Sequence, residues 1–242
     1  MSSSTIVFIT GANTGLGFEA IKALYKSSQA YTILLGCRSV SKGDAAISQL
    51  KSEVSNSSSN ITAVQVDVES DDSIQQAFDT VSSKFGRVDV LINNAGAGFD
   101  REIQAGNMTI REGYNKAWNI NVSGTQVLTT MFMSLLLKST EPRLMFITSG
   151  TSSLIETDKF DSPPLARINA SPPAGWPKEQ SVNPITSYRS SKAGLNMMMR
   201  EWARIVKEDG VKVWCISPGF LATGLGGIGP EQLKKVSRRQ RS

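Results

Sequence analysis

Short apolar segments rich in β-branched residues alternate along the chain with longer segments of helical periodicity. The apolar segments predict strands at residues 5–10, 31–37, 61–66, 88–93, 143–148 and 211–216. The amphipathic segments predict helices at residues 17–27, 42–54, 71–85, 110–137 and 187–208. Strands that are apolar on both faces and alternate with helices are typical of a covered parallel sheet. The pattern therefore predicts an α/β fold, a doubly wound parallel sheet in three αβα layers, with residues 1–242 in a single domain.

The stretch 154–186 interrupts this alternation. It contains six of the nine prolines, and proline lacks a backbone N–H and breaks a helix interior. We therefore expect no regular secondary structure there, although Trp176 indicates that part of the stretch packs. A loop of this length inside a compact domain is usually functional or disordered.

The positive charge of the protein is concentrated at its carboxyl end. The formal net charge is +5, and five Lys or Arg residues lie within the last nine positions. The remaining 21 basic residues balance 21 acidic ones. We interpret residues 230–242 as a basic, solvated tail; such segments can bind nucleic acid, but no nucleic-acid partner is expected here.

The composition excludes several classes of site. With no histidine and only Cys37 and Cys215, a Ser-His-Asp triad is excluded and no metal site is expected. Two cysteines also fit a reducing compartment, so a cytoplasmic protein is expected. No apolar run reaches the ~18 residues of a membrane span and no signal peptide is visible, so no membrane association is expected.

A glycine-rich turn joins the first predicted strand to the first predicted helix. Glycines permit a tight turn and close approach of the backbone to a pyrophosphate, and a helix N-terminus offers unpaired N–H groups. The turn therefore predicts a Rossmann-type dinucleotide site; a plain turn is the alternative. Its residues are Thr10, Gly11, Ala12, Asn13, Thr14, Gly15, Leu16 and Gly17.

The end of the second predicted strand favours NADPH over NADH. An NAD-binding protein places Asp or Glu there for the ribose 2′-hydroxyl, but this strand ends at Arg38 and the next acid is Asp44, inside a predicted helix. Arg38 can bind a 2′-phosphate through its planar guanidinium, with Lys42 or Asn13 adding contacts. The alternative is that Arg38 and Lys42 are ordinary surface cations.

Tyr188 and Lys192 are the strongest candidates for chemistry. They lie four residues apart in the last predicted helix and therefore share one of its faces. A free tyrosine, with a pKa near ~10, exchanges protons poorly at neutral pH, whereas a neighbouring cation favours the phenolate. The pair predicts an acid/base group in a chain without histidine; an exposed, solvated pair is the alternative.

The order of these motifs resembles that of the short-chain dehydrogenase/reductase family. Thr-Gly-x-x-x-Gly-x-Gly is followed along the chain by further family motifs: Asp67-Val68, Asn93-Asn94-Ala95-Gly96, Asn121, Ser149, Tyr188, Lys192 and Pro218-Gly219-Phe220-Leu221-Ala222-Thr223. Each motif is weak alone, but their joint order over residues 5–225 is highly specific. The resemblance implies that NADPH or NADP+ binds, with adenine held at Asp67 and Val68. Further cofactor contacts are implied for Asn93, Asn94, Ala95, Gly96, Tyr188, Lys192, Pro218, Gly219, Leu221 and Thr223.

The resemblance also implies catalytic roles. Tyr188 would give its proton to a carbonyl oxygen as hydride arrives from the nicotinamide. Lys192 would lower the Tyr188 pKa and hold the nicotinamide ribose, and Ser149 would donate a hydrogen bond to the developing alkoxide. Asn121 would hold a water that links Lys192 to solvent. The alternatives are that Thr151 replaces Ser149, and that Asn121 only kinks its helix.

Two departures from the family pattern concern the site. Ser149 and Tyr188 lie 39 positions apart, farther than is usual in the family, so 154–186 is predicted to be an insertion at the active-site mouth. Monomeric carbonyl reductases of the family carry a comparable insertion over their dimerisation helix, so a monomer is preferred over a homodimer, with Trp176 near the substrate. The chain also ends 23 residues after Gly219, which implies that the outer neighbour of the last strand and the substrate lid are missing.

The sequence thus predicts an NADPH-dependent oxidoreductase. It would reduce a ketone, aldehyde or quinone-like carbonyl to the alcohol, without a metal. The alternative is an NADPH-binding protein with little or no turnover, because the C-terminal substrate-loop region is short. A serine hydrolase is excluded by the absent histidine and the lack of a Gly-x-Ser-x-Gly elbow.

Overall fold

Six parallel strands form one sheet in the computed structural model, which describes residues 4–178, 185–219 and 221. Their order across the sheet is β3-β2-β1-β4-β5-β6, and every neighbouring pair is parallel. The order reverses between β1 and β4, as in doubly wound dinucleotide-binding sheets. The predicted Rossmann-type fold is therefore confirmed. The strands are β1 (Thr5–Ile9), β2 (Tyr31–Cys37), β3 (Asn60–Gln65), β4 (Val90–Asn93), β5 (Arg143–Ile147) and β6 (Lys212–Ile216).

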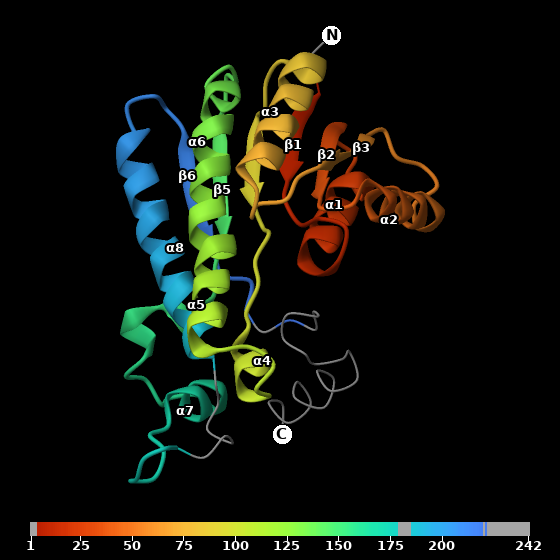
Figure 1. The fold of residues 1–242 in the computed structure, drawn as a ribbon. Helices are drawn as coiled ribbons and strands as arrows, with labels where there is room; N and C mark the ends of the chain where they lie inside the picture. The colour runs from red at the N-terminus through yellow and green to blue at the C-terminus, as the bar shows by residue number, and fades with distance from the viewer. Residues whose placement is uncertain (1–3, 179–184, 220, 222–242) are drawn as a thin grey trace.

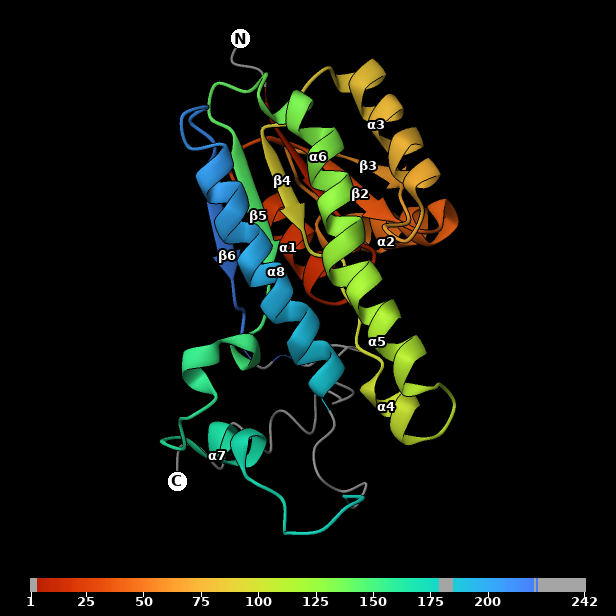
Figure 2. The same ribbon diagram turned by 60° about the vertical axis from the view of Figure 1, so that its left-hand side comes forward.

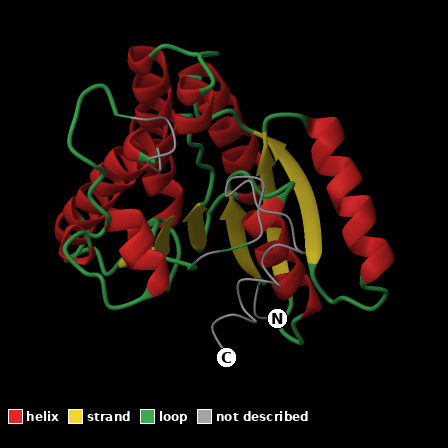
Figure 3. Ribbon diagram, turned by 90° about the horizontal axis from the view of Figure 1, so that it is seen from below, coloured by secondary structure: helices red, strands yellow, loops and turns green. Residues whose placement is uncertain are grey.

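Helices cover both faces of the sheet (Figures 2 and 3). In β1, Ile6 and Phe8 enter the core shared with α3 (Asp71–Phe85), α6 (Thr125–Leu136) and α8 (Thr186–Ile205). The alternate residues Val7 and Ile9 enter the second core, formed with α1 (Gly15–Lys26) and α2 (Val40–Glu53). Because successive side chains of a strand point to opposite faces, both faces of a strand as apolar as β1 must be buried.

The predicted helix 110–137 is interrupted in the structure. It consists of α5 (Ile110–Trp118), a π-helical turn η1 (Asn119–Gly124) and α6. A side chain on Gly124 would overlap the carbonyl oxygen of Val68. The turn therefore packs directly on the segment that follows β3. Such π-helical turns are rare and occur frequently at functional sites.

The proline-rich stretch contains regular structure, so that part of the prediction is wrong. A short 3₁₀ segment spans Leu154–Glu156, and the helix α7 spans Pro163–Asn169. Proline is tolerated in the first helical turn because its missing N–H would have no partner there. Trp176 is 87% exposed, so its side chain is not the part of the stretch that packs. Residues 179–184 lie outside the described part of the chain.

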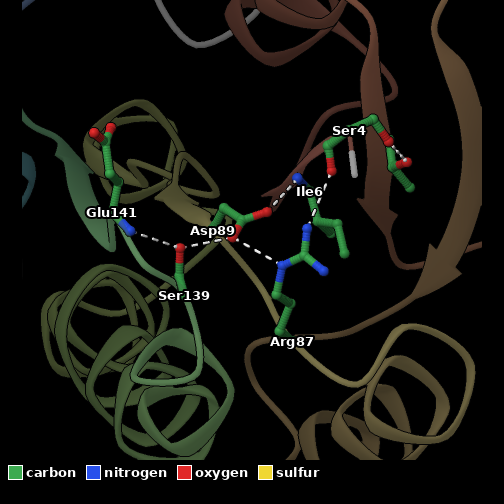
Figure 4. Close-up of polar contacts among 7 residues, drawn as sticks. Ser4, Ile6, Arg87, Asp89, Ser139 and Glu141 are labelled. Carbon is green, nitrogen blue, oxygen red and sulfur yellow. Dashed lines mark hydrogen bonds and ion pairs between the residues drawn. The ribbon is translucent and has the colours of Figure 1, made fainter. Parts of the chain in front are cut away.

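The amino ends of the strands meet at a buried carboxylate (Figure 4). Asp89 accepts hydrogen bonds from the backbone N–H of Ile6 at 2.7 Å, from Arg87 Nε at 3.0 Å and from the Ser139 hydroxyl at 2.6 Å. Burial opposes ionisation of Asp89, but these hydrogen bonds outweigh it and hold the pKa of the carboxyl below its ordinary value. The three donors connect β1, the segment before β4 and the segment before β5, and we call this group the Asp89 clamp.

The carboxyl ends of the strands point toward the lower part of Figure 1, where α4 (Asp100–Gln104) and α7 lie. On one side of the sheet, β6 pairs with β5 and with no other strand of the described residues. Its Trp214 and Ile216 are 40% and 38% exposed. The predicted basic tail, residues 230–242, lies outside the described part of the chain. No helix among the described residues has both the length and the apolar composition needed to cross a bilayer.

Candidate active site

The glycine-rich turn after β1 packs tightly against the end of β4. A Cβ on Gly17 would lie 2.6 Å from Asn94 Nδ2 and 2.7 Å from the carbonyl oxygen of Gly11. The Asn94 amide donates to the carbonyl oxygens of Thr10 at 2.8 Å and Gly11 at 3.1 Å. Gly11 and Gly15 have φ angles of +62° and +57°, which favour glycine. The Asn94 side chain therefore ties the end of β4 to the turn after β1.

The start of α1 fits a pyrophosphate. Its N-cap residue, Thr14, makes no side-chain capping bond, and no acidic residue lies in the first turn. Thr14 and Gly15 are exposed, and Asn13 and Leu16 beside them are partly exposed. Unpaired N–H groups and the positive end of the helix dipole are what a phosphate anion requires.

The residues predicted to select the cofactor lie at the ends of β2 and β3. Arg38, directly after β2, and Lys42, in the first turn of α2, both have exposed side chains. The Gln65 amide donates to the Arg38 carbonyl oxygen at 3.4 Å, so the ends of these two strands are joined. Asp67 is partly exposed and Val68 is buried at the same edge. The residues predicted to bind the 2′-phosphate and the adenine therefore all follow the carboxyl ends of neighbouring strands.

Asn93 differs from the other predicted cofactor residues. Its side chain is 4% exposed and donates to the hydroxyl of Thr129 in α6 at 3.0 Å. The amide therefore serves the core, which leaves only the backbone of Asn93 for a ligand. After β6, Gly219 is exposed with a φ of +79°, and Pro218 and Leu221 are partly exposed. Thr223 lies outside the described residues, so its cofactor contact stays a prediction.

Tyr188 and Lys192 are not a solvated surface pair. Lys192 is 2% exposed, and its ammonium donates to the carbonyl oxygen of Ile147, the last residue of β5, at 2.8 Å. The same nitrogen lies 6.0 Å from the centre of the Tyr188 ring. The helix α8 therefore directs both side chains toward the carboxyl ends of the strands, and the alternative of an exposed pair is wrong.

The electrostatics of the pair differ from the prediction. Burial lowers the Lys192 pKa to about 8, and a weaker interaction with Cys215 opposes this change. Burial raises the pKa of Tyr188 above its ordinary value, and hydrogen bonding to Ser149 offsets part of the rise. The expected lowering of the Tyr188 pKa by Lys192 is wrong for this arrangement. Tyr188 therefore stays protonated at neutral pH, which is the form of a proton donor.

Ser149 lies two residues after the end of β5 and is the N-cap of a 3₁₀ segment, Gly150–Ser152. Its Oγ lies 2.9 Å from the hydroxyl oxygen of Thr151, so the two candidate hydroxyls are hydrogen-bonded to each other. Of these two hydroxyls, only that of Ser149 acts on the Tyr188 pKa, which its hydrogen bond lowers against the larger effect of burial. This interaction favours Ser149 over Thr151 as the hydroxyl beside the phenol.

Asn121 is fully buried in the π-helical turn η1. Its amide donates to the Ala97 carbonyl oxygen at 2.8 Å and to the Ser191 hydroxyl at 2.8 Å, and its oxygen accepts from the Ala97 N–H at 2.9 Å. Asn121 thus lies in a helix irregularity, as the alternative held, and also anchors the segment after β4. The predicted water at this side chain stays a prediction.

Sequence reasoning missed four residues that surround Tyr188 and Asn121: Gly98, Asp100, Ser187 and Ser191. A Cβ on Gly98 would lie 3.2 Å from Tyr188 Cδ2, so the phenol ring packs on the backbone there. Ser191 accepts from Asn121 and donates to the Tyr188 carbonyl oxygen at 2.9 Å. No local pattern identifies such residues, because the partners of Gly98 and Asp100 lie far along the chain.

The described part of the insertion is attached to the start of α8. Arg189 donates to the Thr151 carbonyl oxygen at 2.7 Å and to the Asn169 side-chain oxygen at 3.1 Å. The Asn169 amide in turn donates to the carbonyl oxygens of Glu156 at 2.7 Å and Lys159 at 2.9 Å. The residue next to Tyr188 therefore holds residues 151–169 near the proposed site.

Neither a cluster of possible metal ligands nor the groove against α5 marks this site in the part of the chain that the structure describes. The residues that the structure describes contain no group of three or more His, Cys, Asp or Glu side chains placed to bind a metal. A groove of about 610 Å³ lies against α5 and η1, lined in part by Glu69, Trp118 and Ser123. None of the predicted catalytic residues lines it, so hydrogen-bond geometry rather than surface shape locates the site.

Comparison with protein families matches residues 5–157 and 168–232 to the family described as short chain dehydrogenase. The ten unmatched positions between these ranges fall within the proline-rich stretch 154–186. The chain is 48% identical over 224 residues to a short-chain dehydrogenase/reductase of Phoma sp., covering 91% of this chain and 78% of the relative. It is 45% identical over 226 residues to one of Talaromyces stipitatus, covering 93% and 82%.

Among solved structures, the fold is similar to that of an NADPH-bound carbonyl reductase from chicken fatty liver. The TM-score is 0.71 and the identity 24%, over 93% of this chain and 82% of the other. At this level of identity the likeness concerns the fold.

Proposed function

The chain belongs to the short-chain dehydrogenase/reductase family, and from this premise we propose that it is an NADPH-dependent reductase. Its substrate would be a ketone, aldehyde or quinone-like carbonyl, which is reduced to the alcohol. The observation that carries the proposal is the meeting of a protonated Tyr188, Ser149 and a buried Lys192 at the carboxyl ends of the strands. In open α/β sheets, ligands bind at this edge.

The cofactor would extend across the carboxyl ends of the strands, from β3 to β5. Gly11, Gly15 and Gly17 would admit its pyrophosphate to the start of α1, where the N-cap residue makes no side-chain bond and the first turn has no acidic residue. Arg38 and Lys42 would bind the 2′-phosphate through their exposed cationic groups. The remaining contacts would fall to the other residues that the sequence predicts for the cofactor: Asn13, Thr14, Leu16, Asp67, Val68, Asn93, Asn94, Ala95, Gly96, Pro218, Gly219 and Leu221.

The side chains of the site each have a task in reduction. Bound NADPH supplies the hydride that the carbonyl carbon accepts. Tyr188 donates its phenolic proton to the carbonyl oxygen, which requires the protonated form that burial favours. Ser149 donates a hydrogen bond to the same oxygen as negative charge develops there.

Lys192 would return a proton to the phenolate and hold the nicotinamide ribose. A pKa of about 8 suits both tasks, because the Lys192 ammonium is charged at neutral pH and still releases its proton readily. Asn121 would keep η1 and the segment after β4 in place beside it.

Replacing Tyr188 by Phe tests the proton donor. We expect kcat to fall by about 10²–10⁴-fold, because the general acid is lost while the ring remains. NADPH affinity, measured by fluorescence titration, should change little. Retained turnover would remove Tyr188 from this role.

Replacing Arg38 by Asp tests the cofactor. We expect the ratio of kcat/KM for NADPH to that for NADH to fall by at least about tenfold, because a charged hydrogen bond to phosphate is replaced by repulsion. Asp44→Ala, an exposed change further along α2, is the control. An unchanged ratio would discard the 2′-phosphate assignment.

The second candidate is an NADPH-binding protein with little or no turnover. It is favoured by the Lys192 ammonium, which is bonded to the Ile147 carbonyl oxygen and does not lower the Tyr188 pKa. A panel of carbonyl compounds with NADPH consumption as the readout separates the two. Tight NADPH binding with no consumption on any compound would favour this candidate.

A monomer in the cytoplasm stays our proposal for assembly and location. The described part of the insertion leaves Met197 and Ile205 of α8 at 61% and 55% exposure, so it does not cover this helix completely. Trp118 of α5 is 46% exposed on the neighbouring helix. Sedimentation velocity would decide the state.

A further inference from the structure

Asp100, the first residue of α4, is hydrogen-bonded to the start of α8. Asp100 is buried, with only 8% of the residue exposed. Oδ1 accepts from the Ser187 N–H at 2.8 Å, and Oδ2 accepts from the Ser187 hydroxyl at 2.8 Å and from the Tyr188 N–H at 3.0 Å. One buried carboxylate therefore holds the backbone of the proposed proton donor.

The helix α8 needs this acceptor. The first N–H groups of a helix have no acceptor within the helix, and a Ser, Thr, Asp or Asn at the N-cap normally accepts from the second or third of them. The N-cap residue of α8 is Ile185, which has no such group. Asp100 accepts from both the second and the third N–H, although it lies 87 and 88 positions away in the chain.

The residues just before Asp100 contact the other proposed catalytic side chains. Gly98 supports the Tyr188 ring, and Ala97 exchanges two hydrogen bonds with Asn121. A Cβ on Gly96 would lie 3.1 Å from Lys192 Nζ and 3.0 Å from Asn121 Oδ1. A shift of residues 96–100 relative to α8 would therefore move the phenol relative to its neighbours.

From these contacts we infer that Asp100 is the positioning residue for Tyr188. It holds the start of α8 on the segment after β4, so that the phenol packs on Gly98 and reaches Ser149. The inference rests on the proposed function for its effect on turnover, whereas its effect on the helix start can be measured without turnover.

Asp100→Asn is the sharpest test because the amide is nearly the same shape. Whichever way the amide is oriented, its NH₂ group faces either the Ser187 N–H or the Tyr188 N–H, so one backbone donor loses its acceptor. We expect kcat to fall by about 10–100-fold, since small misplacements of reacting groups reduce rates by such factors. The dissociation constant for NADPH should not change. Ser187→Ala keeps both backbone bonds and should have a smaller effect.

Asp89→Asn is the matched control. Asp89 is also a buried carboxylate with three donors, but it lies before β4 rather than after it. Both variants are assayed at a temperature at which circular dichroism shows them folded. We expect Asp89→Asn to lose stability and keep kcat. An equal loss of kcat in both variants would show that Asp100 acts through stability alone, and would overturn the inference.

Amide hydrogen exchange provides the readout that does not depend on chemistry. In Asp100→Asn, the N–H groups of Ser187 and Tyr188 should exchange at least about tenfold faster than in the parent protein, whereas Asp89→Asn should leave them unchanged. Unchanged exchange in Asp100→Asn would overturn the inference whether or not the protein turns over.

The outcomes also separate this inference from the proposed function. Full turnover in Tyr188→Phe would refute the proposed function, while the exchange rates still test the hold of Asp100 on α8. An inactive Tyr188→Phe together with a fully active Asp100→Asn would refute only the role of Asp100.

Discussion

Two buried carboxylates bracket the strand β4, and they serve different ends of the sheet. Asp89 precedes the strand and joins chain segments through Ile6, Arg87 and Ser139. Asp100 follows the strand and holds the start of α8. Each accepts three hydrogen bonds, so the chemistry is the same. The difference lies in what the donors belong to: structural segments at one end and the proposed proton donor at the other.

The two ends also differ in whether their cation has a carboxylate partner. At the amino end, Arg87 forms an ion pair with Asp89 at 3.0 Å. At the carboxyl end, Lys192 forms no ion pair within the described part of the chain, and burial lowers its pKa to about 8. A buried charge without a counter-charge destabilises the fold, and active sites commonly combine function with such a cost. The comparison therefore assigns stability to the amino end and chemistry to the carboxyl end.

Lys192→Met should have the largest effects on turnover and on stability. We expect turnover to fall by about 10²-fold or more, because the proton source of the phenolate is lost. We also expect the free energy of unfolding at pH 7 to rise by about 3 kcal/mol, from a folded-state pKa of about 8 against an unfolded value of 10.5. Urea unfolding at pH 7 measures the gain.

The sign of the pH dependence follows from the same values. The unfolded chain binds the extra proton between about pH 8 and 10.5, so the stability of the parent protein rises with pH across this window. Lys192→Met should lack that rise, and the exposed control Lys84→Met should keep it. A parent protein whose stability is flat across the window would contradict the assigned charge.

Asp89→Asn should have the opposite effects: a loss of stability without a loss of turnover. We expect a loss of about 1–3 kcal/mol at pH 7, because donors of the Asp89 clamp lose a charged acceptor, with kcat retained. The folded-state pKa of Asp89 lies below its ordinary value of 3.8, so its contribution is fully present above that pH and is lost as pH falls through the folded pKa. Urea unfolding at pH 7 and pH 3 should show the two proteins converging in acid.

Ser139→Ala should have the smallest effect. It removes one donor to Asp89 and leaves Ile6 and Arg87 in place, so we expect a loss of about 1 kcal/mol. A double-mutant cycle with Asp89→Asn should give a combined loss smaller than the sum. Strict additivity would mean that the Ser139 bond contributes independently of the Asp89 clamp.

Local patterns predicted the strands and most helices because burial on both faces of a strand leaves a continuous apolar segment. The same patterns missed the π-helical turn at Asn119–Gly124, where Gly124 packs against the carbonyl oxygen of Val68, a residue distant in the chain. They also missed the helix Pro163–Asn169, because a high proline content outweighed the tolerance of a first helical turn for proline.

The candidate site divides in the same way. The spacing of Tyr188 and Lys192 was enough to place both on one face of a helix. It was not enough to give the direction of the Tyr188 pKa, which rises because the ring is desolvated against Gly98 and the ends of the strands. Desolvation depends on everything packed around a group, so four residues of spacing do not contain it.

By itself, the sequence determined the alternation of strands and helices, the glycine turn, and the pairing of a phenol with an amine. Each depends on residues close together in the chain, where backbone geometry sets the relation. Only the tertiary structure decided that Lys192 donates to Ile147 and that Asp100 caps α8. These contacts join residues 45 to 88 positions apart, and such distances are closed by packing of the whole sheet rather than by any local preference.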